Sequence, residues 1–302
     1  MPYNSKVYKV ITDKMLEILK GGVVPWHKPW NAEEGTPKNL VTKYPYRGIN
    51  VFMLAAQPYS SPYWISYKQV KDLGGRIKAD EVRKYTPVVF FKWIEKTHAT
   101  KTEEEKDEEE LNETTQKVRK WPIIRYYNVY NVEQCTDLES HIPKPPKEEK
   151  KISPIRRCEN VVKNMPKAPE IKHGGGRAFY SPSADYIQIP EINTFDITES
   201  YYSTKFHEMV HSTGHKSRLD RSGVCEHHYF GDAEYSKEEL IAEMGASFLC
   251  AMTGIENKTI DNSASYVENW SKKLRENDRW IVIAGAQAQK AVDFIMNKSI
   301  KN

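Results

Sequence analysis

The segment His207-Glu-Met-Val-His211 has the residue types and the spacing of a metal-dependent hydrolytic site. Two histidines four positions apart lie on one face of a helix, so both imidazoles can bind the same metal ion. Glu208 follows the first histidine and can take a proton from water at the metal. The motif predicts a catalytic site with Zn2+ as the expected ion. Another divalent metal is the alternative, because ligand type alone does not select the ion.

A catalytic zinc usually has three protein ligands, so the chain must supply one more. Gly214 is spaced from His211 as in metzincins, but the third histidine of that class would fall where this chain has Ser217. The remaining source is a glutamate on a later helix. The segment Glu239-Leu-Ile-Ala-Glu243 resembles the ligand helix of zincins that use such a glutamate.

We therefore predict Glu239 as the third metal ligand and Glu243 as the acid that supports a ligand histidine from outside. Two alternatives stay open. Glu243 competes with Glu239 for the metal. Ser236-Lys-Glu-Glu239 also fits a capping box, in which the side chain of Glu239 bonds back to the backbone of Ser236.

Other side chains near the motif are candidates for binding the substrate oxygen. His215 lies one turn beyond His211 and is predicted to stabilise an oxyanion, with an interaction with the helix dipole as the alternative. Tyr202 and Tyr235 can supply a hydroxyl, with packing as their alternative role. We expect an extended peptide substrate to pair with the edge of a strand at residues 185–190 by strand addition.

The elements that must position this chemistry are predicted from caps and periodicity. Ser153-Pro154 begins a helix that reaches Met165. Short strands are expected at residues 178–180 and 185–189. Thr198 is expected to cap the helix that carries the histidines, and Ser236 or Asp232 the helix of Glu239.

The N-terminal half contains a different set of elements. A helix is expected from Asn4 or Ser5 to about residue 20, and strands at residues 87–94 and 125–132. We predict an α+β fold of two domains: a small aromatic-rich domain over residues 1–142, with an acidic hairpin extension at 100–117, and a zincin-like metallopeptidase domain over 153–302. A linker rich in proline and charge joins them at 143–152.

The charge and aromatic content of the N-terminal half favour a polyanionic partner. Lys and Arg outnumber Asp and Glu by 16 to 8 in residues 1–98, although the whole chain has a net charge of only +4. Five of the seven tryptophans lie within residues 1–131, with basic residues interleaved. Rings beside cations suit single-stranded nucleic acid. The alternative is that these aromatics build the core of a small domain.

The composition also limits where the protein acts. No apolar run reaches 18 residues, so we expect no membrane partner. The N-terminus has no apolar signal region and the four cysteines are widely spaced, so we expect a cytoplasmic protein with reduced thiols. A basic chain is also a poor mimic of DNA, which excludes the acidic class of restriction inhibitors.

Several blocks in one order carry a resemblance to a known family: residues 21–30, 37–40, 46–50, 63–69, 73–75, 128–134, 178–182, 185–190, 207–220 and 238–246. These blocks resemble the ArdC-type antirestriction proteins of plasmids and other mobile elements. The resemblance implies a domain that binds single-stranded DNA, a zincin domain, and protection of incoming DNA from host restriction. Where relatives tend to carry a Lys-Gly-Glu-Lys-like turn, this chain differs, at residues 78–84.

The sequence thus predicts an antirestriction protein that binds single-stranded DNA and carries a zinc metallopeptidase site. Its expected partners are single-stranded DNA and a DNA-bound protein substrate or restriction enzyme. The alternative is a non-catalytic protein that coats single strands, or a replication or primase accessory protein, with a structural metal domain. The residues expected to contact DNA are Trp26, Lys28, Trp30, Asn39, Tyr46, Arg47, Asn50 and Lys68.

Overall fold

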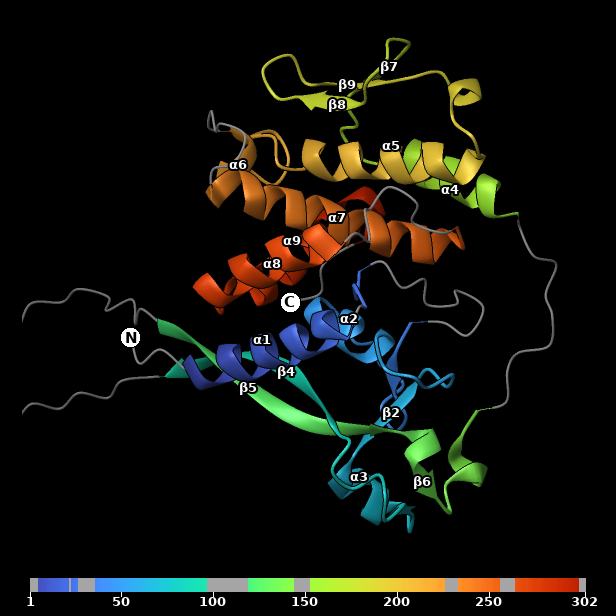
Figure 1. Cartoon of the computed structure of the whole chain (residues 1–302), viewed down its shortest axis with the longest axis vertical. Helices are drawn as coiled ribbons and strands as arrows, with labels where there is room; N and C mark the ends of the chain where they lie inside the picture. Colours follow the sequence, from blue (N-terminus) through green and yellow to red (C-terminus); the bar gives the residue numbers. More distant parts are fainter. Residues whose placement is uncertain are drawn as a thin grey trace, which may run out of the picture.

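The computed structural model describes residues 5–21, 23–26, 36–96, 119–143, 153–225, 233–255 and 264–298. Helices and strands are mixed, with one large sheet in the N-terminal half and most of the helices in the C-terminal half (Figure 1). The expected α+β class is confirmed. The acidic hairpin at 100–117 and almost all of the linker at 143–152 lie outside the described residues.

A four-stranded sheet with the order β1-β2-β5-β4 organises the N-terminal half. β4 and β5 form a long antiparallel ribbon, whose register pairs Thr86 with Val129 and Lys96 with Arg119. This ribbon contains both strands that the sequence predicts, and α1 runs along it (Figure 1). The elements are α1 (Ser5–Lys20), β1 (Lys38–Asn39), α2 (Ile49–Ala55), β2 (Tyr63–Ser66), α3 (Tyr67–Asp72), β3 (Arg76–Ile77), β4 (Thr86–Lys96), β5 (Arg119–Asn131) and β6 (Cys135–Thr136), with short 3-10 turns at Val132–Gln134 and Glu139–His141.

The C-terminal half is a group of helices with a small sheet on one side (Figure 1). Ser153 caps the first helix by accepting a hydrogen bond from the backbone of Arg156, and a proline follows it, as predicted. The small sheet has the order β7-β9-β8, so β9 is its central strand. The elements are α4 (Pro154–Asn164), β7 (Glu170–His173), β8 (Phe179–Ser181), β9 (Tyr186–Ile189), a 3-10 turn (Ile192–Thr194), α5 (Thr198–Ser212), α6 (Ser222–Cys225), α7 (Ala233–Thr253), α8 (Ala264–Glu276) and α9 (Trp280–Ile295).

The two halves share one hydrophobic core. Met15 of α1 and Phe52 of α2 belong to the same buried cluster as the apolar residues of α5, α7 and α9. Phe52 packs on Phe248 with ring centroids 4.6 Å apart. The hydroxyl of Thr12 donates a hydrogen bond of 2.7 Å to the carbonyl of Asp278. The N-terminal helices therefore depend on the C-terminal helices for burial, although the sequence reads as two units.

A glycine allows a close approach between the two halves. A Cβ atom on Gly285 of α9 would lie 2.7 Å from the backbone nitrogen of Ile49, closer than real Cβ contacts allow. Nearby, Arg47 forms an ion pair with Asp293, a carboxylate whose side chain is only 4% exposed. In the ranges that the structure covers, no helix has both the length and the apolar surface needed to cross a bilayer.

Replacing Gly285 by alanine should therefore destabilise the whole fold, because the obstacle is backbone rather than a movable side chain. We expect Gly285→Ala to lower the free energy of unfolding by about 1–3 kcal/mol, the usual range for overpacking. Ile283→Ala on the same helix is the control, since that side chain is 47% exposed and should change stability by less than about 0.5 kcal/mol. Urea denaturation of both variants measures this, and equal stabilities would contradict the shared interface.

Candidate metal centre

Two helices bring the candidate ligands together. The histidines lie late in α5, which begins at Thr198, and Glu239 lies in the second turn of α7. The helices are close because α7 has Gly245 where it meets α5: a Cβ there would lie 2.6 Å from Cγ2 of Val210. Val210 itself is fully buried, so this contact fixes the separation of the two helices.

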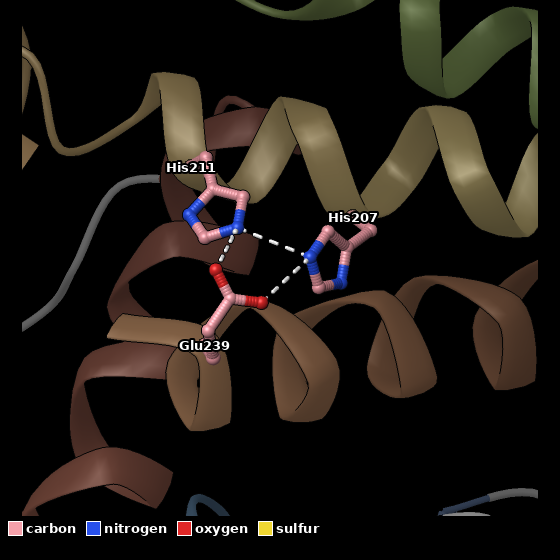
Figure 2. A group of neighbouring side chains, drawn as sticks. All are labelled: His207, His211 and Glu239. Carbon is pink, nitrogen blue, oxygen red and sulfur yellow. Dashed lines mark hydrogen bonds and ion pairs between the residues drawn. The ribbon is translucent and has the colours of Figure 1, made fainter. Parts of the chain in front are cut away.

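The three candidate ligands point at one another (Figure 2). The Nε2 atoms of His207 and His211 are 3.0 Å apart. The Glu239 carboxylate faces both rings, with Oε2 3.5 Å from Nε2 of His207 and Oε1 3.4 Å from Nε2 of His211. All the ligand atoms lie within 4.8 Å of one another, and within the described part of the chain this is the cluster suited to a metal ion.

This donor set fits a divalent cation. Two nitrogens at zinc-binding distance in a tetrahedral site lie about 3.3 Å apart, close to the observed separation of the Nε2 atoms. Two imidazoles and one carboxylate form the ligand set of catalytic zinc sites that keep one position open. The same set also accepts other first-row divalent ions. The side chains of His207 and Glu239 are 19% and 27% exposed, which leaves the site accessible from solvent.

A neighbouring acid orients one ligand. Oε1 of Glu238 lies 3.4 Å from Nδ1 of His211, and Glu238 is itself held by Arg221 through Nε at 2.9 Å. Burial lowers the pKa of His211, but the bond to Glu238 and the charges of Glu239 and Glu208 outweigh it and raise that pKa to about 9. Burial raises the pKa of Glu238, yet the contacts with His211 and Arg221 leave it lowered. A metal ion must displace the His211 proton, because only neutral imidazole binds metal.

The acid beside Nδ1 of His211 is thus Glu238, which the sequence analysis did not single out, and the support of a ligand histidine by Glu243 stays a prediction. In the structure Oε2 of Glu243 accepts a hydrogen bond of 3.1 Å from Nε1 of Trp26. Glu238 and Glu239 are adjacent, so one helix turn presents one acid to each side of His211. Sequence reasoning missed Glu238 because it weighed acids four residues apart, whereas the signal was the Glu-Glu pair itself.

The capping alternative for Glu239 is contradicted by the bounds of α7. The helix begins at Ala233, so Ser236 lies inside it and is not its N-cap. Ser236 is buried, and its hydroxyl accepts a hydrogen bond of 2.8 Å from Nζ of Lys273. Asp232, the other proposed cap, lies outside the described residues. Thr198, predicted as the cap of α5, is instead its first residue.

Glu208 differs from the other acids of the site. Its side chain is buried, with only 8% of the residue exposed. Its carboxylate forms no hydrogen bond or ion pair with any residue that the structure describes. A largely buried carboxylate without a hydrogen bond or ion pair is unusual in a merely structural position. Its place next to His207 leaves it available to exchange a proton with a bound substrate or water.

The predicted oxyanion-binding residues have different surroundings. Nδ1 of His215 lies 2.8 Å from Oγ of Ser217 and 3.9 Å from Oδ2 of Asp185. Tyr202 is buried and donates a hydrogen bond to Glu159, so its hydroxyl already has a partner within the fold. The side chain of Tyr235 lies outside the description. His215 therefore remains the candidate, held near the C-terminal end of α5.

The small sheet is attached to the end of α5 by a buried arginine. Arg218, whose side chain is 1% exposed, pairs with Asp185 and donates a hydrogen bond of 3.1 Å to the hydroxyl of Tyr180. The expected pairing of a peptide with the strand at residues 185–190 is wrong for β9, because β7 and β8 already flank it. The outer strands of this sheet are β7 and β8, and β8 packs against α5.

Several residues expected to contact DNA serve the fold instead. Trp26 is fully buried between the halves, so the prediction that its ring stacks on DNA is wrong for this structure. Arg47 pairs with Asp293, and the amide of Asn50 bonds the backbone of Val89 in both directions, at 2.7 and 2.8 Å. Asn50 bonds the backbone of β4 because β4 is an edge strand with unpaired backbone groups. Trp26 and Arg47 have partners in the C-terminal half because the two halves share a core.

The remaining residues of that set have mixed positions. Tyr46 is half-buried and packs against the core, and burial raises its pKa. Asn39 bonds Gln69 through Nδ2 at 3.1 Å, and Lys68 is exposed on α3. Lys28 and Trp30 lie outside the described residues. The six predicted contacts that the structure describes thus do not lie together on one surface.

Sequence models of two protein families match the chain in this order. The N-terminal domain of the anti-restriction factor ArdC matches residues 5–130, and a zincin-like metallopeptidase matches residues 157–287. The metal-free crystal structure of the antirestriction ArdC protein from plasmid R388 is similar, with a TM-score of 0.70, 33% identity, and coverage of 97% of this chain and 98% of that chain. Its Mn(II)-bound structure gives a TM-score of 0.69 and 31% identity over the same shares of the two chains.

Curated relatives include longer proteins. Two DNA primases TraC of Escherichia coli are each 34% identical over 96% of this chain, which spans only 27% and 20% of their lengths. The uncharacterized protein y4eC of Sinorhizobium fredii is 28% identical, with coverage of 96% of this chain and 91% of that protein. The fold and the site define the C-terminal half as a zincin-like metallopeptidase domain. The chain belongs to the ArdC-type antirestriction family.

Metal binding should discriminate between the acids of α7. We expect Glu239→Ala to weaken binding of Mn2+ or Zn2+ by more than the roughly 10–100-fold that loss of an outer partner causes. Glu238→Gln should fall within that range, and Glu243→Ala below it, because its carboxylate bonds Trp26. Calorimetric titration of the metal-free variants measures the three affinities. A larger loss for Glu243→Ala than for Glu239→Ala would exchange their roles.

The helix separation is tested by Gly245→Ala, whose new methyl group would overlap Val210. We expect a loss of about 1–3 kcal/mol in stability and weaker metal binding, because Glu239 moves away from the histidines. Adding Val210→Ala frees the space, so the double variant should be less destabilised than the sum of the single variants. Thermal unfolding and metal titration measure both effects, and strictly additive losses would refute the contact.

Proposed function

We propose that this chain is a metal-dependent peptidase that acts in antirestriction while bound to single-stranded DNA. The observation that supports this most is the arrangement around Glu208: a buried carboxylate without a partner among the described residues, beside three converging metal ligands. A structural metal site has no use for such an acid. The proposal takes zinc as the resident ion, although the similar ArdC structure holds Mn(II).

In this proposal His207, His211 and Glu239 hold the cation. When bound, the cation acts as a Lewis acid that acidifies water and polarises a peptide carbonyl. Glu208 accepts a proton from the attacking water and returns it to the leaving amine. Glu238 keeps His211 oriented through Nδ1, and His215 donates to the oxygen that gains charge. An extended peptide would lie along β8, the outer strand that packs on α5.

The DNA-binding part of the proposal rests on the basic N-terminal third and on family membership. A protein tethered to entering single-stranded DNA meets other DNA-bound proteins at a high local concentration. The proposed substrate is therefore a protein bound to that DNA or a restriction enzyme. The site would act in the cytoplasm of the receiving cell, where restriction takes place.

A second candidate is favoured by one comparison. Most of this chain matches a limited part of the primases TraC, so the same unit occurs within larger replication proteins. In this reading the chain coats single strands or assists priming, and its metal domain is structural. It predicts that loss of Glu208 leaves function intact, whereas loss of a metal ligand unfolds the domain.

The two candidates differ in what Glu208→Gln does. The variant keeps the side-chain shape and the three metal ligands but removes the base. We expect wild type to protect unmodified DNA that enters a restricting host, and Glu208→Gln to give no protection above the empty control. Transformation efficiency measures this. Glu199→Gln, at the other glutamate of α5, is the matched control and should protect fully.

Equal protection by wild type and Glu208→Gln would favour the coating role and reject proteolysis as the mechanism. Protection by neither protein would reject the antirestriction role itself. Metal titration of Glu208→Gln should match wild type, which shows that a loss of protection does not come from a lost ion.

A further inference from the structure

A basic and aromatic surface covers β1, β2, α3 and the turn after β1. We call it the lysine–tyrosine surface. Lys38 and Lys43 each place Nζ 5.3 Å from the centre of the Tyr63 ring. On α3, Nζ of Lys71 lies 4.8 Å from the centre of the Tyr67 ring. Its members are Lys38, Lys43, Tyr44, Tyr63, Tyr67, Lys68 and Lys71.

The backbone holds this surface in a defined shape. Oδ1 of Asn39 accepts hydrogen bonds of 3.0 Å from the backbone of Val41 and of Thr42. Lys43 then adopts a positive φ of 60°, and the chain returns beside β1, where the backbone of Asn39 donates a hydrogen bond to the carbonyl of Tyr44. Nδ2 of Asn39 also bonds Gln69 on α3, so the turn and the helix are fixed to each other. The lysines therefore do not depend on a free loop for their positions.

The positive charge of the surface is not neutralised. Lys38, Lys43, Lys68 and Lys71 form no ion pair with any residue that the structure describes, and neither does Asp72, the acid of α3. Contact of an ammonium with a ring face leaves its N–H groups free to bind an anion. Two rings remain open to solvent: Tyr44 is 76% exposed and Tyr67 is 52% exposed.

We propose that the lysine–tyrosine surface is the site that holds single-stranded DNA, which rests on the proposed function and gives its DNA-binding step a location. Lys38 and Lys43 bind neighbouring phosphates, and Tyr44 and Tyr67 stack on unpaired bases. Exposed rings beside unpaired cations match a single strand better than a duplex, whose bases are already stacked. Trp26, the ring that the sequence favoured, is buried elsewhere.

The position of the surface suits a tether. In Figure 1, β2 and α3 lie toward the lower end of the molecule, whereas α5 lies toward the upper end, with α1 and the C-terminal helices between them. DNA held on the lysine–tyrosine surface therefore leaves the metal centre free. A protein bound to the same DNA can reach the metal centre while the strand stays attached.

Binding of a fluorescent oligothymidine of about 20 nucleotides to the full-length protein tests this proposal. We expect Lys38→Gln/Lys43→Gln to weaken binding about tenfold at low salt. The slope of log affinity against log salt should fall by about 1.4, because each phosphate contact on a single strand contributes about 0.7. Tyr44→Ala should weaken binding about fivefold or more with little change in the salt slope, because it removes stacking rather than charge.

Matched controls separate this site from overall charge. Lys9→Gln/Lys14→Gln removes two lysines of α1 that already pair with Asp13 and Glu17, and should bind DNA like wild type. Metal titration and circular dichroism should match wild type for every variant. Tight single-strand binding that is lost equally in both double variants, or in neither, would overturn the site while the proposed function stands.

Two further outcomes test whether the protein binds single-stranded DNA at all and whether the tyrosines stack on bases. If wild type binds no single-stranded DNA, the DNA part of the proposed function falls together with this site. If duplex DNA of equal length binds as tightly and Tyr44→Ala has no effect, the surface attracts polyanions by charge alone and the stacking assignment is wrong. Preference for the single strand with loss in Tyr44→Ala supports the proposal.

Discussion

The contact between α5 and α7 is the constraint on which the metal centre depends. α5 alone provides two imidazoles, which cannot form a catalytic site without a third donor. Glu239 reaches them because Gly245 allows α7 to approach Val210 without a side chain between the backbones. A methyl group on Gly245 would overlap Val210, so the helices would have to separate and Glu239 would move away from both rings. α4 and α9 pack against both helices and hold α5 and α7 together.

Charge balance follows from the same geometry. Three glutamates face two histidines, and an excess of buried negative charge would be costly without partners. Arg221 neutralises Glu238, and the raised pKa of His211 shows how strongly the acids favour a positive charge between them. Glu208 stays outside these pairings, which distinguishes an acid that can exchange protons from acids that hold the site together.

The shared core joins this chemistry to the N-terminal half. Trp26 donates to Glu243, which lies one helical turn beyond Glu239, and its ring packs edge-on to Trp270 at 6.4 Å. Gly285 of α9 packs directly against the backbone of Ile49, and Arg47 forms an ion pair with Asp293 in the same contact between the halves. Trp26, Arg47 and Asn50, which the sequence predicted as DNA contacts, therefore have structural roles. Exposed lysines and tyrosines with ordinary sequence surroundings form the free basic surface.

The sequence by itself determined the features that depend on local spacing. The pattern His207-Glu-Met-Val-His211 on a helix required two ligands on one face, and Ser153-Pro154 fixed a helix start because both effects act within one turn. The β-formers around Val88 and Val129 likewise predicted their strands. Glu239 was predicted from the resemblance of the segment Glu239–Glu243 to the ligand helix of zincins, and its carboxylate lies beside both histidines.

Only the tertiary structure decided which neighbour each polar group meets. Glu238 meets Nδ1 of His211 because the rotation of α7 against α5 turns that residue toward the histidine, and no short-range pattern records that rotation. Trp26 is buried because helices from the other half cover it, and β9 has no free edge because it pairs with both β7 and β8. Contacts between residues distant in sequence depend on packing, and one sequence does not specify packing through local rules.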